Sequence, residues 1–362
     1  MGRPARLDSL TGLRGIAAWW VVLYHFRSYL APYIDSEVVR VIAEGQLAVD
    51  FFFILSGFVI YLNYHDRVEP HWSSYANYVG ARLARIYPLH IATLLFFLLL
   101  AGATVARKES WSGLPPAWDW GALAFQLSLT QAWGTPHALT WNFPSWSISA
   151  EFFAYLLFPA ILHFSAPRDR SWPSLLIQAG VIFATLALYF DARSLHSLGS
   201  DIEQNALVRC LLQFWGGCLL CAIFVRRSDW VNRFGWISGF IGLGVATLGI
   251  AGDLPDYVFM PTSFWLIILG CISQSSVASR LLSLRFFFWV GEISYSTYLC
   301  HIPVRELFKL ISVTDQGDAS LLSIVVALLA VAITSVILYR LVELPGKTFT
   351  LAALRIERKV RE

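Results

Sequence analysis

The feature that most constrains this sequence is a series of apolar stretches, each about 20 residues long. Ten such stretches occur, near 9–30, 46–62, 86–106, 146–164, 174–190, 206–225, 234–251, 258–275, 287–304 and 321–340. A helix needs about 20 mainly apolar residues to cross the hydrocarbon core of a bilayer. The sequence therefore predicts an all-α polytopic membrane protein with about ten transmembrane helices.

The composition supports a lipid environment. Hydrophobic residues make up 57% of the chain and charged residues only 14%, whereas a soluble domain carries about a quarter charged residues. The net charge of +3 is not concentrated in a basic stripe, so we expect no nucleic-acid partner. All five cysteines fall within apolar stretches, and the CxxC at 218–221 has no second pair at metal-ligand spacing. We therefore expect packing cysteines, with no metal and no cofactor.

A further apolar segment, 121–133, is too short to cross a bilayer and decides the expected topology. If it is re-entrant or interfacial, ten crossings remain and both termini are cytoplasmic. Most of the 27 Lys and Arg residues then lie on the cytoplasmic side, as the positive-inside rule requires. We expect residues 1–362 to form a single membrane domain with no appended soluble domain, and the oligomeric state is left open.

Ionisable residues inside apolar stretches are costly and commonly functional. Arg14 and His25, in the first stretch, are eleven residues apart, which places them on one helix face about 16 Å apart along the axis. The cation can hold a phosphate near the cytoplasmic end, and the imidazole can take a proton from a hydroxyl. The alternative is a structural pair that binds backbone carbonyls.

Arginines and carboxylates elsewhere add to this pattern. Arg82 and Arg85 are one turn apart at the start of the third stretch, where they can bind the phosphates of a soluble donor or simply mark a cytoplasmic helix end. Glu151 lies about a turn inside its stretch and can orient an imidazole, hold an acceptor hydroxyl or pair with a buried cation. For Glu343, at the inner end of the last stretch, an ion pair is the simplest account.

On the expected topology the polar residues divide between the two sides of the membrane. The outer half contains His25, Asp50, Glu151 and His301, and the inner boundary contains Arg14, Arg82 and Arg85. Such a division favours an enzyme with an anionic donor inside and an acceptor approached from outside. A transporter also has polar residues facing the interior of its bundle, but no internal repeat is evident here.

Six segments in order resemble the motifs of the acyltransferase-3 family of bacterial membrane O-acyltransferases. The first is LDSLTGLRGIAAWWVVLYHF, in which Arg14 and His25 form the family's R-x10-H arrangement. The others are VDFFFILSGFVI, the RxxR of Arg82 and Arg85, SWSISAEFFAYLLFP, GEISYSTYLCH and VELPGKTF. The resemblance extends over nearly the whole chain.

The resemblance implies a multi-pass protein of the bacterial inner membrane that transfers an acyl group, usually acetyl, from cytoplasmic acyl-CoA to a sugar hydroxyl. Typical acceptors are O-antigen, exopolysaccharide, peptidoglycan and lipo-oligosaccharide, including glycolipids. Antibiotics and other small acceptors also occur in the family, so the acceptor stays open. The resemblance further implies that Arg14 and His25 are essential and that the RxxR holds the donor. The SGNH-type domain of some relatives is not expected.

The working mechanism assigns His25 as general base, with Glu151 or Asp50 orienting its ring, and a covalent acyl-histidine as a variant. The expected site residues fall into three groups. They are catalytic His25, Arg14 and Glu151, acyl-CoA-binding Arg14, Arg82 and Arg85, and supporting or acceptor-binding Asp50, Tyr298 and His301. A non-enzymatic membrane partner built on the same fold is a further alternative, which the intact Arg14 and His25 pair disfavours.

Overall fold

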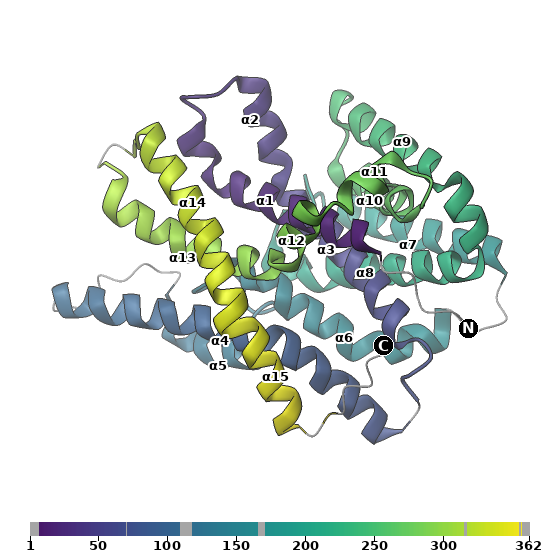
Figure 1. The fold of residues 1–362 in the computed structure, drawn as a ribbon, viewed down its shortest axis with the longest axis horizontal. Coiled ribbons are helices and arrows are strands. Elements are labelled where there is room, and N and C mark those ends of the chain that lie inside the picture. The colour runs from purple at the N-terminus through teal and green to yellow at the C-terminus, as the bar shows by residue number, and fades with distance from the viewer. Residues whose placement is uncertain are drawn as a thin grey trace.

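The computed structural model describes residues 7–69, 71–108, 118–165, 171–314, 317–354 and 356. All regular elements in this part of the chain are helices (Figure 1). In order, they are α1 (Asp8–Leu30), α2 (Ser36–Ala43), η1 (Glu44–Leu47), α3 (Ala48–Tyr64), α4 (Trp72–Lys108), η3 (Trp120–Ala122), α5 (Leu123–Ser128), η4 (Phe143–Ser145), α6 (Trp146–Ser165), α7 (Trp172–Ala192), α8 (Ile202–Arg226), α9 (Ser228–Ala251), α10 (Asp256–Ile272), α11 (Val277–Leu282), α12 (Arg285–Glu292), α13 (Ser294–Ser312), α14 (Leu321–Leu338), η5 (Tyr339–Glu343) and α15 (Leu344–Ala353).

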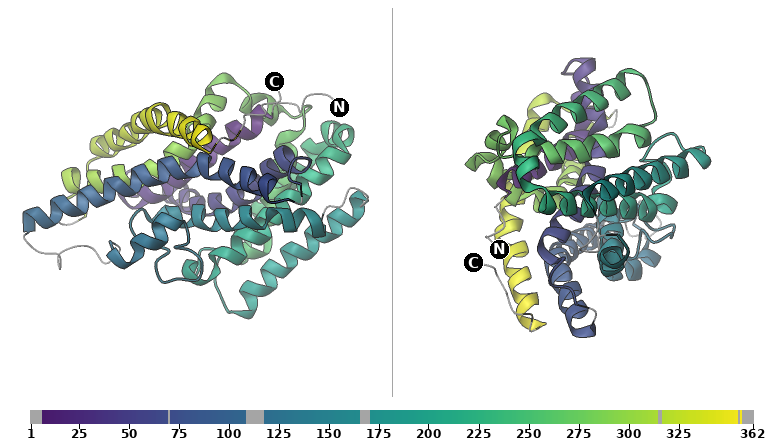
Figure 2. Two further views of the ribbon diagram at one scale, coloured as in Figure 1. Left: turned by 90° about the horizontal axis from the view of Figure 1, so that it is seen from below. Right: turned by 90° about the vertical axis from the view of Figure 1, so that its right-hand side faces the viewer.

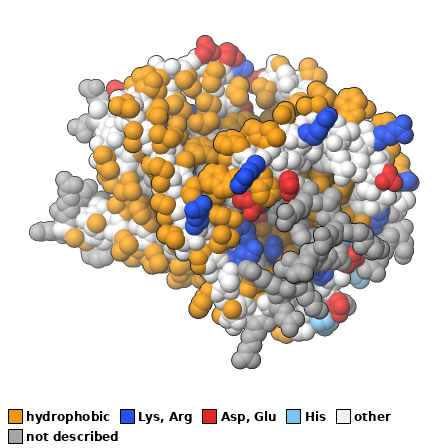
Figure 3. Space-filling model, viewed as in Figure 1, with side chains coloured by type: hydrophobic (Ala, Val, Ile, Leu, Met, Phe, Trp, Pro, Cys, Tyr) orange, Lys and Arg blue, Asp and Glu red, His pale blue; other side chains and the backbone are white. Residues whose placement is uncertain are grey.

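Seven helical segments of the described chain are long and apolar enough to cross a membrane. They correspond to α2–α3, α4, α6 with η4, α7, α8, α9 and α14–α15. Hydrophobic side chains cover much of the molecular face in Figure 3, as expected for a surface in contact with lipid. The protein is therefore an all-helical, polytopic membrane protein. Three expected spans are not among the seven: 9–30, 258–275 and 287–304 correspond to α1, to the shorter apolar helix α10, and to α12 with α13.

Helix α1 runs through the middle of the fold. It packs against α12 and α13, and it also contacts α3, α10 and α14. In Figure 1, α13 and α14 lie on one side of α1, whereas α7 to α10 lie on the other. Figure 2 shows the long α4 running beneath the α14–α15 segment. Residues of α1 are consequently placed where several helices converge.

Helices α3 and α8 approach each other closely because a glycine lies at each side of the contact. A Cβ added at Gly57 would overlap the carbonyl oxygen of Phe214, and one at Gly217 would overlap that of Ile54. Small residues allow helix backbones to come together in membranes, where packing and not water exclusion drives association. Gly57, in the second apolar stretch, therefore serves close helix packing.

Two expected helix boundaries were wrong. The stretch 287–304 is not one helix, because the chain breaks at Ile293 between α12 and α13. The carbonyl of Gly291, just before the break, accepts hydrogen bonds from the guanidinium of Arg14. The other error concerns α4, which begins at Trp72, so Arg82 and Arg85 lie well inside the helix and not at its start.

The segment 121–133 and the end of the chain show two further local features. The segment contains α5, which has six residues and is followed by Leu129 in a left-handed conformation. Six residues of helix extend only about 9 Å, too short to cross the hydrocarbon core. At the C-terminal end, α14 continues through the π-helical turn η5 into α15. This turn contains Glu343, whose side chain is 1% exposed.

Candidate active site

A cavity of about 170 Å³ lies between α1, α3, α4, α6 and α13. Three arginines line it: Arg14 from α1, and Arg82 and Arg85 from α4. Glu151 of α6 lines the same cavity. The structure thus brings together the three arginines expected to bind the donor. It also places Glu151 beside them, which differs from the expectation that this carboxylate lies with His25 on the other side of the protein.

Arg14 is fixed by the break between α12 and α13. Its Nη2 donates to the carbonyl of Gly291 at 2.8 Å, and its Nε donates to the hydroxyl of Ser294 at 2.9 Å. Its Nη2 also lies 3.8 Å from a carboxylate oxygen of Glu292. Arg14 therefore binds a backbone carbonyl and lines the cavity at the same time.

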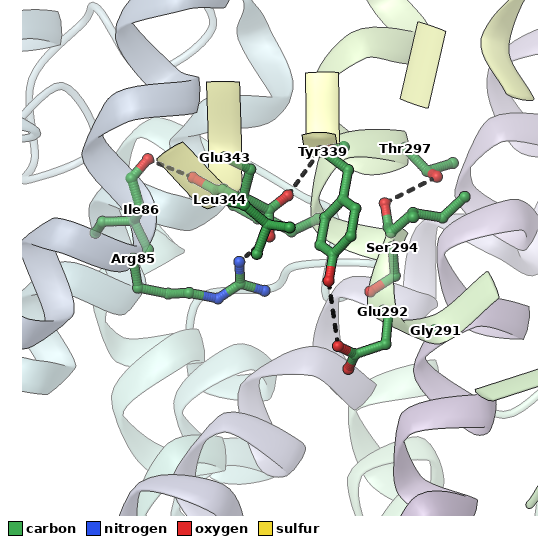
Figure 4. Close-up of polar contacts among 12 residues, drawn as sticks. Arg85, Ile86, Gly291, Glu292, Ser294, Thr297, Tyr339, Glu343 and Leu344 are labelled. Atoms are coloured by element: carbon green, nitrogen blue, oxygen red, sulfur yellow. Dashed lines mark hydrogen bonds and ion pairs between the residues drawn. The ribbon is translucent and has the colours of Figure 1, made fainter. Parts of the chain in front are cut away.

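Arg82 and Arg85 are held by different partners. Arg85 forms an ion pair with Glu343, and the other oxygen of Glu343 accepts a hydrogen bond from Ser296 at 2.6 Å. Figure 4 shows the Arg85 guanidinium directed at Glu343. The ion pair expected for Glu343 is confirmed. Arg82 donates to the hydroxyl of Tyr64 at 2.6 Å, and no carboxylate is paired with it among the described residues.

Glu151 accepts two hydrogen bonds within the cavity. The hydroxyl of Ser56 donates to it, as does the hydroxyl of Tyr155, one turn further along α6, at 2.5 Å. Neither Ser56 nor Tyr155 is among the site residues expected from the sequence. The small hydroxyl in an otherwise apolar stretch was the signal that could have indicated Ser56.

The cavity extends along one face of α3. Val49, Phe52, Ser56 and Val59 all line it at helical spacing, which corresponds to about 15 Å along the axis. The C-terminal end of this face leads towards Tyr64, the partner of Arg82. At the other end the ring of Phe52 contacts the ring of Tyr298 at a centroid distance of 6.0 Å. The cavity therefore has an arginine-rich part and an aromatic part.

Tyr298 lies between the cavity and two histidines. It lines the cavity, and its hydroxyl lies 2.8 Å from the hydroxyl of Ser147. On its other side its ring is 5.9 Å from that of His301. The ring of His301 in turn stacks on that of His25, with centroids 5.0 Å apart and planes inclined by 29°. The structure thus brings together His25, His301 and Tyr298 from α1 and α13.

Asp50 is not part of this cluster of histidines. Its carboxylate accepts from Arg209 at 2.7 and 2.5 Å and from Gln213 at 2.5 Å. Asp50 and Arg209 are 0% and 2% exposed, and together they form a buried ion pair between α3 and α8. Among the described residues, neither Asp50 nor Glu151 contacts the His25 ring. The expectation that one of them orients this ring is therefore replaced by the stacking of His301.

The arginines lie in one part of the cavity. The imidazoles of His25 and His301 lie beyond its aromatic part. Arg14 and His25 both face the α12–α13 segment, as their spacing on one helix face predicts. Guanidinium groups can hold phosphates through charge-assisted hydrogen bonds. A neutral imidazole can accept a proton from a hydroxyl that attacks an acyl group. The site can therefore bind an anionic donor and activate a hydroxyl.

Comparisons with known proteins identify the family of the chain. A family model described as an acyltransferase domain matches residues 7–340. The chain is similar to acyltransferase MdmB of Streptomyces mycarofaciens, with 27% identity over 92% of this chain and 89% of MdmB. It is also similar to O-acetyltransferase OatA of Staphylococcus aureus, with 25% identity over 95% of this chain and 58% of OatA. The chain therefore spans somewhat more than half the length of OatA.

A shorter match extends to protein 2 of the picA locus of Rhizobium radiobacter, with 35% identity over 25% of this chain. No solved structure matches the chain. The family model spans most of the sequence, including the helices that carry Arg14, Arg82, Arg85, Glu151 and His301. The chain belongs to the acyltransferase-3 family, and it is a polytopic membrane acyltransferase.

Proposed function

We propose that the protein transfers an acyl group, in the first instance acetyl, from cytoplasmic acyl-CoA to a hydroxyl of a carbohydrate acceptor. The acceptor is of the O-antigen, exopolysaccharide or lipo-oligosaccharide type. The observation that carries this proposal is the cavity lined by three arginines, which borders the His25 and His301 pair through Tyr298.

The donor binds with its phosphates at the arginines. Arg85 is paired with Glu343 and Arg14 lies 3.8 Å from Glu292, so Arg82, which has no carboxylate partner among the described residues, supplies most of the free positive charge. The acyl-bearing arm then extends along α3 past Ser56 towards Phe52 and Tyr298. This orientation directs the thioester towards the two imidazoles and leaves the charged end of the donor at the arginines. Glu151, hydrogen-bonded to two hydroxyls, lines the cavity between these two ends.

His25 acts as general base in the transfer. As the acceptor oxygen attacks the thioester carbonyl, its proton passes to the imidazole of His25. The new C–O ester bond forms, the C–S bond breaks, and the imidazolium returns the proton to the departing thiolate of coenzyme A. A covalent acyl-histidine gives the same products in two steps. Holding both reactants in one site supplies much of the rate enhancement.

We place the protein in the bacterial inner membrane, with ten crossings and both termini in the cytoplasm. The charge distribution of the sequence supports this topology. The arginine-rich part of the cavity then faces the cytoplasmic donor, and the acceptor approaches His25 from outside. Transfer occurs in one membrane-embedded site.

The proposal is tested in membranes that contain the expressed protein, radiolabelled acetyl-CoA and the surface glycans of the host. Wild-type protein is expected to label a glycan fraction, and His25→Ala is expected to abolish labelling while the protein remains folded. His196→Ala replaces an exposed histidine outside the site and provides the matched control. If the label instead appears in a small soluble compound, the acceptor is that compound and not a carbohydrate of the cell surface. Normal turnover by His25→Ala would contradict the role of this residue.

The donor site is tested by Arg82→Ala in the same assay. We expect the KM for acetyl-CoA to rise about tenfold and to become less sensitive to salt, because one charge-assisted contact to a phosphate is lost. Arg40→Ala, which removes an exposed arginine paired with Glu37, should leave the KM unchanged. An unchanged KM in Arg82→Ala would show that the donor phosphates lie elsewhere.

A further inference from the structure

Besides Nε of Arg305, two buried polar atoms in the segments around His25 have no hydrogen-bond partner among the described residues. They are Nε2 of His301 and Oδ1 of Asn142. Both side chains are buried, with exposures of 0% and 1%. Most buried polar atoms in folded proteins are hydrogen-bonded, so each exception requires an explanation.

The hydrogen bonds of His301 define which of its nitrogens carries the proton. Its Nδ1 lies 2.6 Å from the carbonyl oxygen of Tyr298. A carbonyl oxygen can only accept a hydrogen bond, so Nδ1 is the protonated nitrogen. In the neutral ring, Nε2 then carries a lone pair and is an acceptor. The unpaired atom of His301 is thus a hydrogen-bond acceptor without a donor.

The same reasoning fixes the orientation of Asn142. Its amide nitrogen donates to the carbonyl of Leu299 at 3.1 Å, so its oxygen points away as a second acceptor. Leu299 is two residues before His301 on α13. The residue after Asn142, Phe143, places its ring 5.2 Å from that of His25. Both unpaired acceptors therefore belong to the junction of η4, α1 and α13, where His25 lies.

His25 completes this junction. The residue is only partly buried, and within the described chain its ring packs against the rings of Tyr24, Phe143 and His301. No hydrogen bond to its ring nitrogens is formed by the described residues. A purely structural role for His301 would require only its bond to Tyr298, and it would not explain the second nitrogen or the neighbouring amide oxygen.

We infer that His301 and Asn142 form the part of the acceptor site that binds hydroxyl groups, an inference that rests on the proposed function. Two lone-pair acceptors beside the general base are complementary to a ligand that donates several hydrogen bonds. The fitting acceptor is a compound with neighbouring hydroxyls, one of which reacts at His25. The others donate to Nε2 of His301 and to Oδ1 of Asn142. His301 is then a positioning residue that selects polyols over simple alcohols.

Two substitutions of His301 separate the roles of its two nitrogens. Asn places an amide near the position of Nδ1 and can keep the bond to Tyr298, but it has no acceptor at the far end. Gln reaches the position of Nε2 and can present its amide oxygen there. The expected result for His301→Asn is a KM for the glycan acceptor that is at least about tenfold higher, with the KM for acetyl-CoA unchanged. His301→Gln should remain within about threefold of wild type, because it keeps the acceptor atom.

The opposite pattern would overturn the inference. If His301→Asn behaves as wild type and His301→Gln is impaired, only the bond to Tyr298 matters. Equal loss in both variants, with both KM values changed, would mean that His301 supports the fold of the site and does not bind the acceptor.

A measurement without turnover separates this inference from the proposed function. In protein labelled with ¹⁵N-histidine, solid-state NMR reports which ring nitrogen is protonated, and His301→Asn identifies the His301 signals. We expect protonated Nδ1, and a shift of the Nε2 signal on adding saturating glycerol but not 1-propanol. A protonated Nε2, or no shift with glycerol, would overturn the inference. Absence of acyl transfer by wild-type protein, with the expected NMR result, would overturn only the proposed reaction.

Discussion

At the scale of single residues, the fold depends on charges that are buried away from both water and lipid. Asp50 and Arg209 form an ion pair that is almost completely inaccessible, and Arg209 also lies over the ring of Trp146 at 5.3 Å. A charge inside a bilayer is costly unless it is paired or reaches water. The pair therefore stabilises the contact between α3 and α8 only while both partners are present.

Removing one partner of this pair should cost more stability than removing both. Asp50→Leu leaves the Arg209 guanidinium buried without its carboxylate, which should destabilise the protein by about 3–5 kcal/mol. Asp50→Leu combined with Arg209→Met should recover most of this loss. The measurement is thermal unfolding in detergent, followed by the fluorescence of the 15 tryptophans. A double variant no more stable than Asp50→Leu would contradict an ion pair as the source of the effect.

The sequence indicated which charged residues line the cavity better than it indicated their partners. Arg14, Arg82, Arg85 and Glu151 were candidates because an ionisable group in an apolar stretch is costly. Their partners could not be predicted, because tertiary packing brings them together from distant parts of the chain. Glu343, for example, is 258 positions from Arg85. No periodicity or spacing in one sequence encodes such a pairing.

At the scale of helices, close packing of α3 on α8 positions α3 so that Asp50 pairs with Arg209 and Ser56 donates to Glu151. The approach requires that no side chain project from Gly57 or Gly217 into the opposite backbone. Substitution is consequently more restricted at both glycines than their position in apolar helices suggests.

Alanine at either of these glycines should separate the two helices. Gly57→Ala is expected to lower the melting temperature markedly and to reduce acyl transfer, since its methyl group would overlap the carbonyl oxygen of Phe214. Gly244→Ala in α9 is the matched control, because the space that its methyl group would enter is open to 4 Å and alanine favours helix. Equal melting temperatures for the two variants would show that the α3–α8 contact can relax at little cost.

Helix positions were largely predictable, whereas helix ends and interruptions were not. Apolar stretches of the right length follow from bilayer thickness, and each of the ten corresponds to a helix or to a pair of helices. The break at Ile293 was missed because hydropathy does not report the hydrogen bond that Arg14 donates to the Gly291 carbonyl. The early start of α4 was missed because its first turns are less apolar than the rest.

At the scale of the whole molecule, the proposed orientation in the membrane implies that the two ends of the site face different compartments. Lys and Arg side chains in Figure 3 cluster near the middle and towards one edge of an otherwise mainly hydrophobic face. The positive-inside rule predicts the orientation from the charge distribution of the loops.

Cysteine labelling at the two ends of α9 tests this orientation. The five native cysteines are buried, so they should contribute little background. Asp253→Cys, just after α9, should react with a membrane-impermeant maleimide in intact cells. Ser228→Cys, at the first residue of α9, should react only after permeabilisation. The reverse pattern would invert the topology, and labelling of both positions from outside would mean that α9 does not cross.

Because of the π-helical turn at Tyr339–Glu343, the number of residues in this segment matters more than which residues they are. A π turn accommodates one residue more than an α turn and occurs frequently at functional sites. Leu341, within this turn, is 71% exposed, so another apolar side chain can replace it without loss. Deletion of the same residue would instead remove the extra residue of the π turn and change the direction of the residues within this turn, Glu343 included. Glu343 would then lose its alignment with Arg85, so natural variation here should tolerate exchanges of amino acid but exclude single-codon losses.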